Sequence, residues 1–158
     1  MILDPDELPP NGAYKFLTSA IVPRPIAFVS TQSVAGVLNV APFSYFTVVT
    51  DSPPILSVAV NLRRGEPKDT LRNVLDTGEF VINLVGEPML ARMVRASGDW
   101  APEVDEFALT GLTPAPSLRV SPPRVAESPR RRTRASRSRF GSRCRGSPRP
   151  RPAGCCRR

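Results

Sequence analysis

The chain has 158 residues and a formal net charge of +8, but this charge is unevenly distributed. Residues 1–129 hold 10 basic and all 14 acidic residues, whereas residues 130–158 hold 12 arginines and no acidic residue. There is no histidine, and the three cysteines all lie in residues 130–158. This composition excludes Ser-His-Asp triads, Cys-His dyads and histidine metal sites, and no metal site is predicted. It predicts one domain over residues 1–129, followed by an unrelated Arg-rich segment.

The predicted elements begin with a short helix over residues 13–21, with Phe16, Leu17 and Ala20 on one side, ended by Pro23. Strands then dominate, because β-branched and aromatic residues recur between turn signals. The predicted strands cover residues 25–31, 37–41, 44–50 and 55–61.

Further along, the hydrophobic period changes to that of a helix over residues 69–77, with Gly78 as its stop. A buried strand over 80–85 and a helix over 88–96 follow, and residues 97–113 read as a loop. Most strands are joined by short turns. The order therefore favours a mainly antiparallel sheet or barrel with peripheral helices.

The segment 63–70 (RRGEPKDT) leads into the predicted helix at 69–77. A helix N-terminus offers unpaired N–H groups and a partial positive charge, to which Lys68 adds a full charge and Thr70 a hydroxyl. These groups can form an anion site. The alternative is a solvated loop in which Asp69 is an ordinary N-cap.

The segment 39–46 (NVAPFSYF) contains a proline that we expect to break its strand and free backbone groups. Asn39 and Ser44 could then hydrogen-bond the polar edge of a ring, with Phe43, Tyr45 and Phe46 around it. The alternative is a strand kink surrounded by core aromatic residues.

Side chains that could perform chemistry themselves are scarce. Residues 1–129 contain no cysteine, and the neighbouring carboxylates of Asp105 and Glu106 are expected to be solvated separately in a loop. No Walker-type or Rossmann-type glycine motif is present. If the protein is an enzyme, a cofactor must supply the reactive atoms, and no catalytic side chain is nominated.

Several segments together resemble the flavin reductase-like family, which has the FMN-binding split-barrel fold. Each motif is weak alone, but the ordered set is specific and covers residues 10–129. The matching segments are 24–31 (RPIAFVST), 39–46, 68–73 (KDTLRN), 78–83 (GEFVIN), 104–107 (VDEF), 111–114 (GLTP) and 123–128 (PRVAES).

The resemblance implies a mainly β, Greek-key-like split barrel, and a homodimer that holds FMN at the subunit interface. It implies that Ser30 and Thr31 lie near the phosphate–ribityl end of FMN, and that Lys68 and Thr70 contact the phosphate with help from Arg63 or Arg64. The residues implied to line the isoalloxazine ring and ribityl chain are Asn39, Ala41, Pro42 and Ser44.

By the same resemblance we expect an oxidoreductase that transfers hydride from NADH or NADPH to flavin, with a partner monooxygenase as a possible acceptor. The alternatives are a non-catalytic FMN-binding electron carrier and a basic-tailed nucleic-acid-binding protein. No apolar run is long enough to span a bilayer and no signal peptide is evident, so we expect a cytoplasmic protein without membrane contact.

Residues 130–158 depart from the family pattern. They consist largely of Arg, Ser, Pro, Gly, Ala and Cys and have no periodicity, so we expect a disordered segment. GC-rich coding DNA read out of frame gives this mixture, and our hypothesis is a frameshift near residue 129 that leaves the last barrel strands missing. The alternatives are a native disordered tail and a basic arm that binds nucleic acid.

Overall fold

The computed structural model describes residues 4, 7–129 and 136–137. Helices and strands alternate along it much as the hydrophobic periods predict. The helical segments are α1 (Gly12–Ala20), α2 (Asp69–Thr77), the 3-10 helix η2 (Glu87–Met89), α3 (Leu90–Ala96) and α4 (Glu106–Thr110). The strands are β1 (Ala27–Gln32), β2 (Leu38–Phe43), β3 (Phe46–Asp51), β4 (Pro54–Val58), β5 (Glu79–Asn83), β6 (Pro114–Ala115), β7 (Arg124–Val125) and β8 (Ser136–Arg137).

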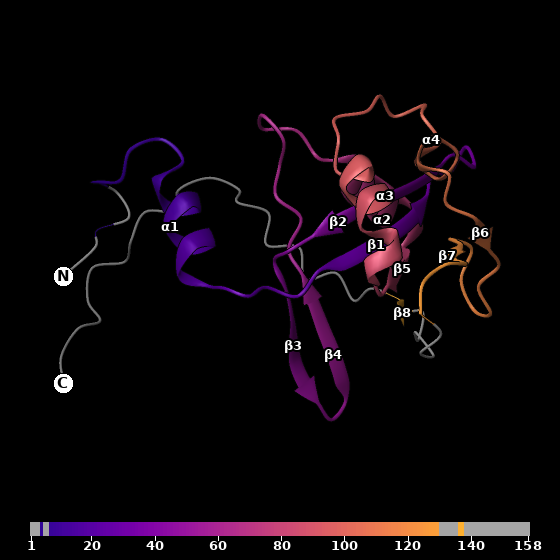
Figure 1. Cartoon of the computed structure of the whole chain (residues 1–158), viewed down its shortest axis with the longest axis horizontal. Coiled ribbons are helices and arrows are strands. Elements are labelled where there is room, and N and C mark those ends of the chain that lie inside the picture. The colour runs from indigo at the N-terminus through magenta and orange to yellow at the C-terminus, as the bar shows by residue number, and fades with distance from the viewer. Residues whose placement is uncertain (1–3, 5–6, 130–135, 138–158) are drawn as a thin grey trace, which may run out of the picture.

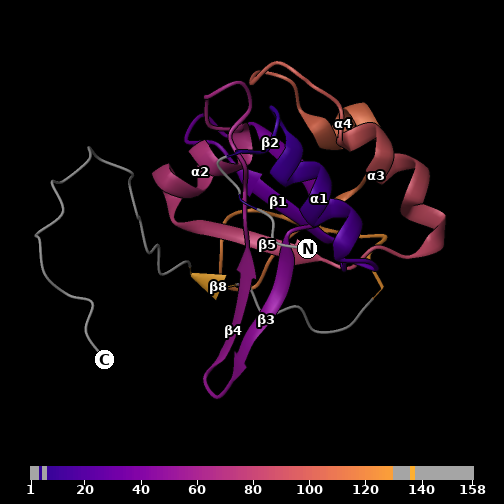
Figure 2. The same cartoon turned by 90° about the vertical axis from the view of Figure 1, so that its left-hand side faces the viewer.

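The main sheet has the strand order β2-β1-β5-β8, and each neighbouring pair is antiparallel. β3 and β4 form a separate antiparallel hairpin that projects away from the sheet, while α2 and α3 lie against it (Figures 1 and 2). β6 and β7 form a third, short pair. The predicted mainly antiparallel architecture with peripheral helices is confirmed.

The prediction that Pro42 breaks its strand is wrong. β2 continues through Pro42 to Phe43, and Pro42 lies opposite Phe28 of β1. β2 is an outer strand of the described sheet, and an outer strand tolerates a proline whose missing N–H is not needed by a neighbour.

The core lies on both faces of the main sheet, because successive side chains of β1 alternate between them. Phe28 packs with Val40 and Phe107 in one cluster, whereas Val29 packs with Phe43 in the other. Helices α3 and α4 cover the first face, since Met93, Ala96 and Phe107 all belong to that cluster.

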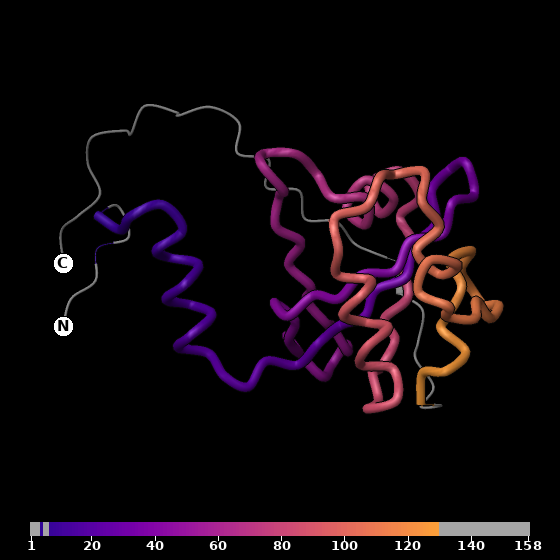
Figure 3. The backbone as a smooth tube through the Cα atoms, turned by 45° about the horizontal axis from the view of Figure 1, so that its top comes forward, coloured from indigo at the N-terminus to yellow at the C-terminus, as the bar shows by residue number. Residues whose placement is uncertain are grey.

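Helix α1 stands apart from the sheet (Figure 3). It confirms the helix expected at residues 13–21, but none of its residues is buried, and Phe16 and Leu17 are 46% and 44% exposed. Its described contacts with the rest of the chain include an edge-to-face pair between Tyr14 and Tyr45, and an Arg24 guanidinium that donates to the Thr18 carbonyl.

Residues 97–113 were expected to form a loop, but they contain α4. Its start is capped by Asp105, whose side chain accepts a hydrogen bond from the Ala108 N–H at 3.0 Å, and its end is the left-handed Gly111. Phe107 is buried, with 1% of its surface exposed, while Trp100 and Leu109 are half-buried.

The predicted Arg-rich disordered segment lies outside the described residues, except for Ser136–Arg137, which pair with β5. The frameshift hypothesis concerns the same segment and stays a prediction. Within the described part of the chain, no helix has the length and apolarity needed to cross a bilayer.

Candidate functional site

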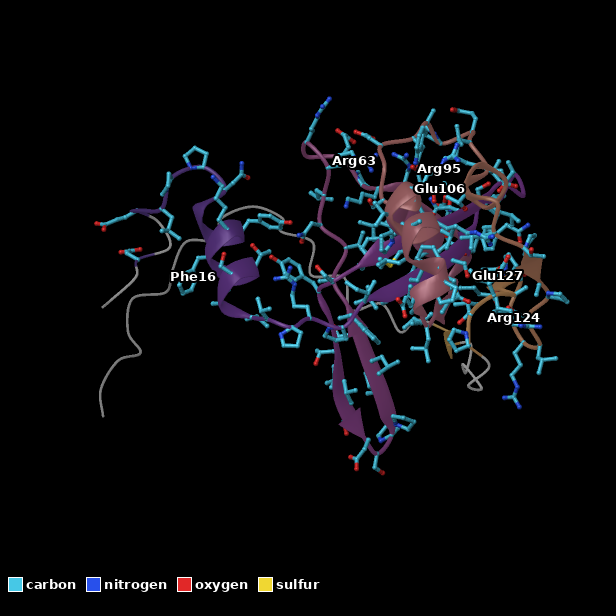
Figure 4. The ribbon with its side chains drawn as sticks, viewed as in Figure 1. Phe16, Arg63, Arg95, Glu106, Arg124 and Glu127 are labelled. Carbon is cyan, nitrogen blue, oxygen red and sulfur yellow. The ribbon has the colours of Figure 1, made fainter. Side chains whose placement is uncertain are left out.

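A small cavity lies where β2, the start of α2, the end of α3 and α4 meet. We call it the α2 cavity. Its volume is about 50 Å³, which accommodates a few water molecules or one small anion. Figure 4 shows two of its lining residues, Arg63 on the loop before α2 and Glu106 on α4, on the side of the sheet away from the β3–β4 hairpin. The lining comprises Asn39, Ala41, Pro42, Phe43, Arg63, Lys68, Asp69, Thr70, Ala96, Ser97 and Glu106.

Most of the residues expected from the sequence meet in this cavity, although they come from two separate segments. The expected residues that line it are Asn39, Ala41, Pro42, Arg63, Lys68 and Thr70. Three others, Ser30, Thr31 and Ser44, do not line it. Arg64, named with Arg63 as a helper, is exposed and also lies outside the lining.

A tight turn directs the chain into α2. The backbones of Arg63 and Glu66 pair across it at 2.8 Å, and Arg64 and Gly65 between them have φ values of 50° and 89°. Positive φ at both central positions is the type I′ geometry, which glycine adopts without strain. Because of this turn, Arg63 and the start of α2 both line the α2 cavity.

Lys68 is the N-cap residue of α2, and its side chain makes no capping hydrogen bond. The expectation of Asp69 as an ordinary N-cap is therefore wrong: Asp69 is the first helical residue, and its carboxylate pairs with Arg72. The first-turn N–H groups of α2 stay available for an anion that enters the cavity. The Lys68 ammonium lies 5.7 Å from the centre of the Phe43 ring.

Below the cavity lies a buried set of hydrogen-bonded side chains that we call the Asn39 network. Its centre is Asn39 of β2, which is 7% exposed. The Oδ1 atom of Asn39 accepts from the hydroxyls of Thr31 at 3.1 Å and Thr70 at 2.9 Å, and the Asn73 amide donates to Thr31 at 3.0 Å. The network fixes the start of α2 against β1 and β2.

Because of this network, the side chains of some predicted site residues are not free to bind an anion. The hydroxyl hydrogen of Thr70 is engaged by Asn39, so Thr70 presents chiefly its backbone N–H to an anion. Thr31 belongs to the layer behind the cavity. The buried face of α2 is also polar, made by Thr70 and Asn73, while Leu75 is 53% exposed.

Ser30 points to the opposite face of the sheet from Thr31, as alternation along a strand requires. Its hydroxyl donates to the Pro123 carbonyl at 2.5 Å and accepts from the Asn83 amide at 3.1 Å. Asn83 in turn accepts the Val125 N–H at 2.8 Å. Ser30 therefore helps attach the segment around β7 to the sheet, and this position gives no support to its expected place near a phosphate.

Glu106 was not among the residues expected at the site, and the expectation that its carboxylate is solvated in a loop is wrong. Only 6% of its surface is exposed. Its Oε2 atom accepts two hydrogen bonds from β2, one from the Asn39 amide at 2.9 Å and one from the Val40 N–H at 2.8 Å. The second bond satisfies a backbone donor at the edge of the sheet.

Burial raises the pKa of Glu106 from its ordinary value of 4.5 to about 7. The Val40 N–H opposes this rise because it stabilises the carboxylate, while the nearby charge of Asp69 adds to it and that of Arg63 opposes it. A titratable group near neutrality thus forms part of the wall of the α2 cavity.

The α2 cavity suits a phosphate better than a ring system. It combines an uncapped helix start with a lysine, which are the donors that a phosphate monoester prefers. The volume excludes a three-ring isoalloxazine, so any flavin held here would place its phosphate in the cavity and its ring outside it. The donor set therefore fits the phosphate end of FMN, which Lys68 and the first turn of α2 would hold.

Residues 19–132 match the family model described as a flavin reductase-like domain. An uncharacterized protein of Aquifex aeolicus is 48% identical over 116 residues, which cover 73% of this chain and 59% of that protein. Among solved structures, nitrilotriacetate monooxygenase component B from Bacillus cereus is 41% identical with a TM-score of 0.77, covering 81% of this chain and 63% of that one. The 2-nitrobenzoate 2-nitroreductase NbaA from Pseudomonas fluorescens is 31% identical with a TM-score of 0.71, and the match covers 82% of this chain and 61% of that one.

This chain spans about six tenths of the length of these relatives. The family match covers most of the described residues, and the strand arrangement agrees with split-barrel relatives of known structure. With the sequence match, the ordered motifs and the shared architecture in agreement, the chain belongs to the flavin reductase-like family and has its split-barrel fold.

Proposed function

We propose that this chain is the FMN-binding part of an NAD(P)H-dependent flavin oxidoreductase. The observation that carries the proposal is the α2 cavity, where an uncapped helix start and Lys68 meet in a member of a flavin-related oxidoreductase family. FMN, when bound, would supply the redox chemistry by accepting a hydride from NADH or NADPH, which requires no acid, base or nucleophile from the protein.

The side chains of the cavity would bind and orient the cofactor. Lys68 would balance the phosphate charge, and the N–H groups of the first turn of α2 would donate to the phosphate oxygens. Asn39, Ala41 and Pro42 line the same cavity from β2 and would meet the part of FMN next to the phosphate. The Asn39 network would hold these groups in place before the cofactor arrives, which reduces the entropic cost of binding.

We also propose that the protein acts as a homodimer. The α2 cavity encloses too little space for the flavin ring, so a further surface is needed to cover it. The β3–β4 hairpin carries exposed apolar side chains, among them Val48 at 66% and Leu56 at 51% exposure. Apolar surface of this kind is a common mark of an interface. Sedimentation equilibrium of the full chain tests the dimer.

The partner and the location are extensions of the same proposal. A relative with 41% identity is named component B of a monooxygenase, which supports a partner monooxygenase that uses the reduced flavin. A cytoplasmic location stays a prediction. The nucleic-acid alternative concerns the Arg-rich segment, nearly all of which lies outside the described residues.

The proposal is tested with the full chain. The purified protein is mixed with FMN, desalted, and examined for retained flavin absorbance, and then for oxidation of NADH and of NADPH with added flavin. Retained flavin with nicotinamide oxidation is the expected result. Retained flavin without turnover would indicate the electron-carrier alternative, and no retained flavin would contradict the proposal.

A further inference from the structure

The charged side chains that line the α2 cavity fall into two groups. Two of the four charged side chains that line it are engaged by partners outside it: Arg63 pairs with Asp99, and Asp69 pairs with Arg72. Each pair is close to neutral as a unit. These pairs therefore add little net charge to the cavity.

The other two charged lining residues, Lys68 and Glu106, form no ion pair with any described residue. With Glu106 ionised, their charges cancel and the cavity is close to neutral. With Glu106 protonated, the cavity carries one net positive charge. The protonation state of Glu106 thus decides whether the cavity attracts an anion.

Among the described residues, no other group near Glu106 takes over this role. The charges that act on it are Asp105 from its own helix, Asp69 from α2 and Arg63 from the preceding loop. β2 and the end of α3 contribute only neutral residues to the lining, such as Asn39 and Ser97. Glu106 is therefore the buried titratable group that faces the cavity.

The hydrogen bonds assign the proton to one oxygen. Oε2 already accepts from Asn39 and Val40, and Oε1 accepts none from the described residues. A proton on Oε1 leaves both bonds to β2 intact and gives Glu106 an O–H donor for a group in the cavity. An ionised Oε1 instead repels an anion there.

We propose that Glu106 is a proton-exchanging positioning residue of the phosphate site, which takes up a proton when an anionic phosphate enters the α2 cavity. This inference rests on the proposed function. Binding of FMN is then coupled to uptake of a proton, and FMN affinity falls as the pH rises through the range in which free Glu106 ionises. Burial, which raises the pKa of this carboxyl to about 7, places that range near neutrality.

The sign of this effect separates it from the ionisation of the ligand. A phosphate monoester loses its second proton near pH 6, so attraction to Lys68 alone would make affinity rise toward pH 7 and then stay level. A group of pKa about 7 that must be protonated for binding instead raises the Kd about 15-fold between about pH 7 and pH 8.5.

The experiment measures the Kd of FMN and of riboflavin across this pH range by quenching of flavin fluorescence. The proteins are the full wild-type chain, Glu106→Gln, and the control Glu103→Gln, which alters an exposed glutamate three residues earlier. The amide oxygen that Glu106→Gln introduces can still accept both hydrogen bonds from β2. The expected result is a Kd for FMN that rises with pH in the wild type and the control but not in E106Q, with no such rise for riboflavin.

Proton uptake is also measured directly on the wild type, by titration calorimetry with FMN in buffers of different ionisation enthalpy. This keeps the test valid if E106Q does not fold. Flavin binding without proton uptake, or an equal pH dependence in E106Q, would overturn the role of Glu106 and leave the proposed function standing. Absence of FMN binding at every pH would overturn both.

Discussion

Replacement of Glu106 by glutamine should change the pH dependence of folding stability. The free energy of unfolding of E106Q, compared with that of the wild type, should be more favourable at alkaline pH than at acid pH. The carboxyl is buried, and its pKa is raised from 4.5 to about 7 on folding. A raised pKa means that the folded state holds the proton more tightly than the unfolded state. The associated stability is fully present below pH 4.5 and is lost as the pH rises through 7.

The size of this effect follows from the two pKa values. A shift of this size corresponds to about 3 kcal/mol once the pH is well above 7, and most of this is lost between pH 5 and pH 8. Glutamine cannot ionise, and its amide oxygen can keep both hydrogen bonds to β2. The advantage of E106Q over the wild type should therefore grow by about 2–3 kcal/mol between these pH values.

Urea unfolding followed by far-UV circular dichroism at pH 5 and pH 8 measures this difference. With an m-value of about 2 kcal/mol per M, the midpoint of E106Q should gain about 1 M on the wild type between the two pH values. Glu103→Gln, an exposed change, should show no such gain. Equal destabilisation by E106Q at both pH values would refute the reasoning, because it would mean that folding does not raise the pKa of Glu106. A larger loss at pH 8 would also refute it, because it would make the ionised carboxylate the stabilising form.

Three further changes test the fold that positions the site, each by urea unfolding against the wild type. Phe107→Ala removes a side chain that is 1% exposed at the centre of one core cluster and should cost about 3–5 kcal/mol; a loss under about 1 kcal/mol would show that α4 does not pack as described. Asn83→Ala breaks three hydrogen bonds that join β5 to β1 and β7 and should cost about 2–4 kcal/mol, whereas an unchanged midpoint would contradict their role. Gly78→Ala places a Cβ in open space at φ 71°, so only backbone strain opposes it; the expected loss is about 1 kcal/mol, and a gain would be inconsistent with the left-handed helix end.

The sequence was sufficient to predict the parts of the fold that depend on local patterns. The strand β5 and the helix α2 with its stop at Gly78 appear close to where the hydrophobic period and the glycine placed them. The predicted end of β2 was wrong, because the effect of Pro42 depends on whether its strand has a neighbour on both sides. That information lies in the sheet order and not in the local sequence.

The helix α4 was missed for a different reason. It has five residues, too few for a hydrophobic period to show. A signal was nevertheless present, since Asp105 is a favourable N-cap and Gly111 a favourable residue after a helix end. With this helix recognised, Glu106 would have been predicted on a helix and not in a solvated loop.

The candidate site divides in a similar way. Lys68 could be predicted because a basic residue at a helix start is visible in the sequence. The burial of Glu106 could not, because it depends on contact with Asn39, which lies 67 positions away in the chain. The separation of Ser30 from Thr31 needed knowledge of which face of β1 meets α2.

The most direct test of the central claim compares FMN and riboflavin affinity in the wild type, in Lys68→Met and in the control Lys15→Met. Lys15 is an exposed lysine on α1. Riboflavin lacks the phosphate, so loss of a charge-assisted contact worth about 1.5–3 kcal/mol should weaken FMN binding by about 10- to 150-fold in K68M and leave riboflavin binding unchanged. An equal loss for both flavins, or no loss for FMN, would contradict a phosphate site at the start of α2.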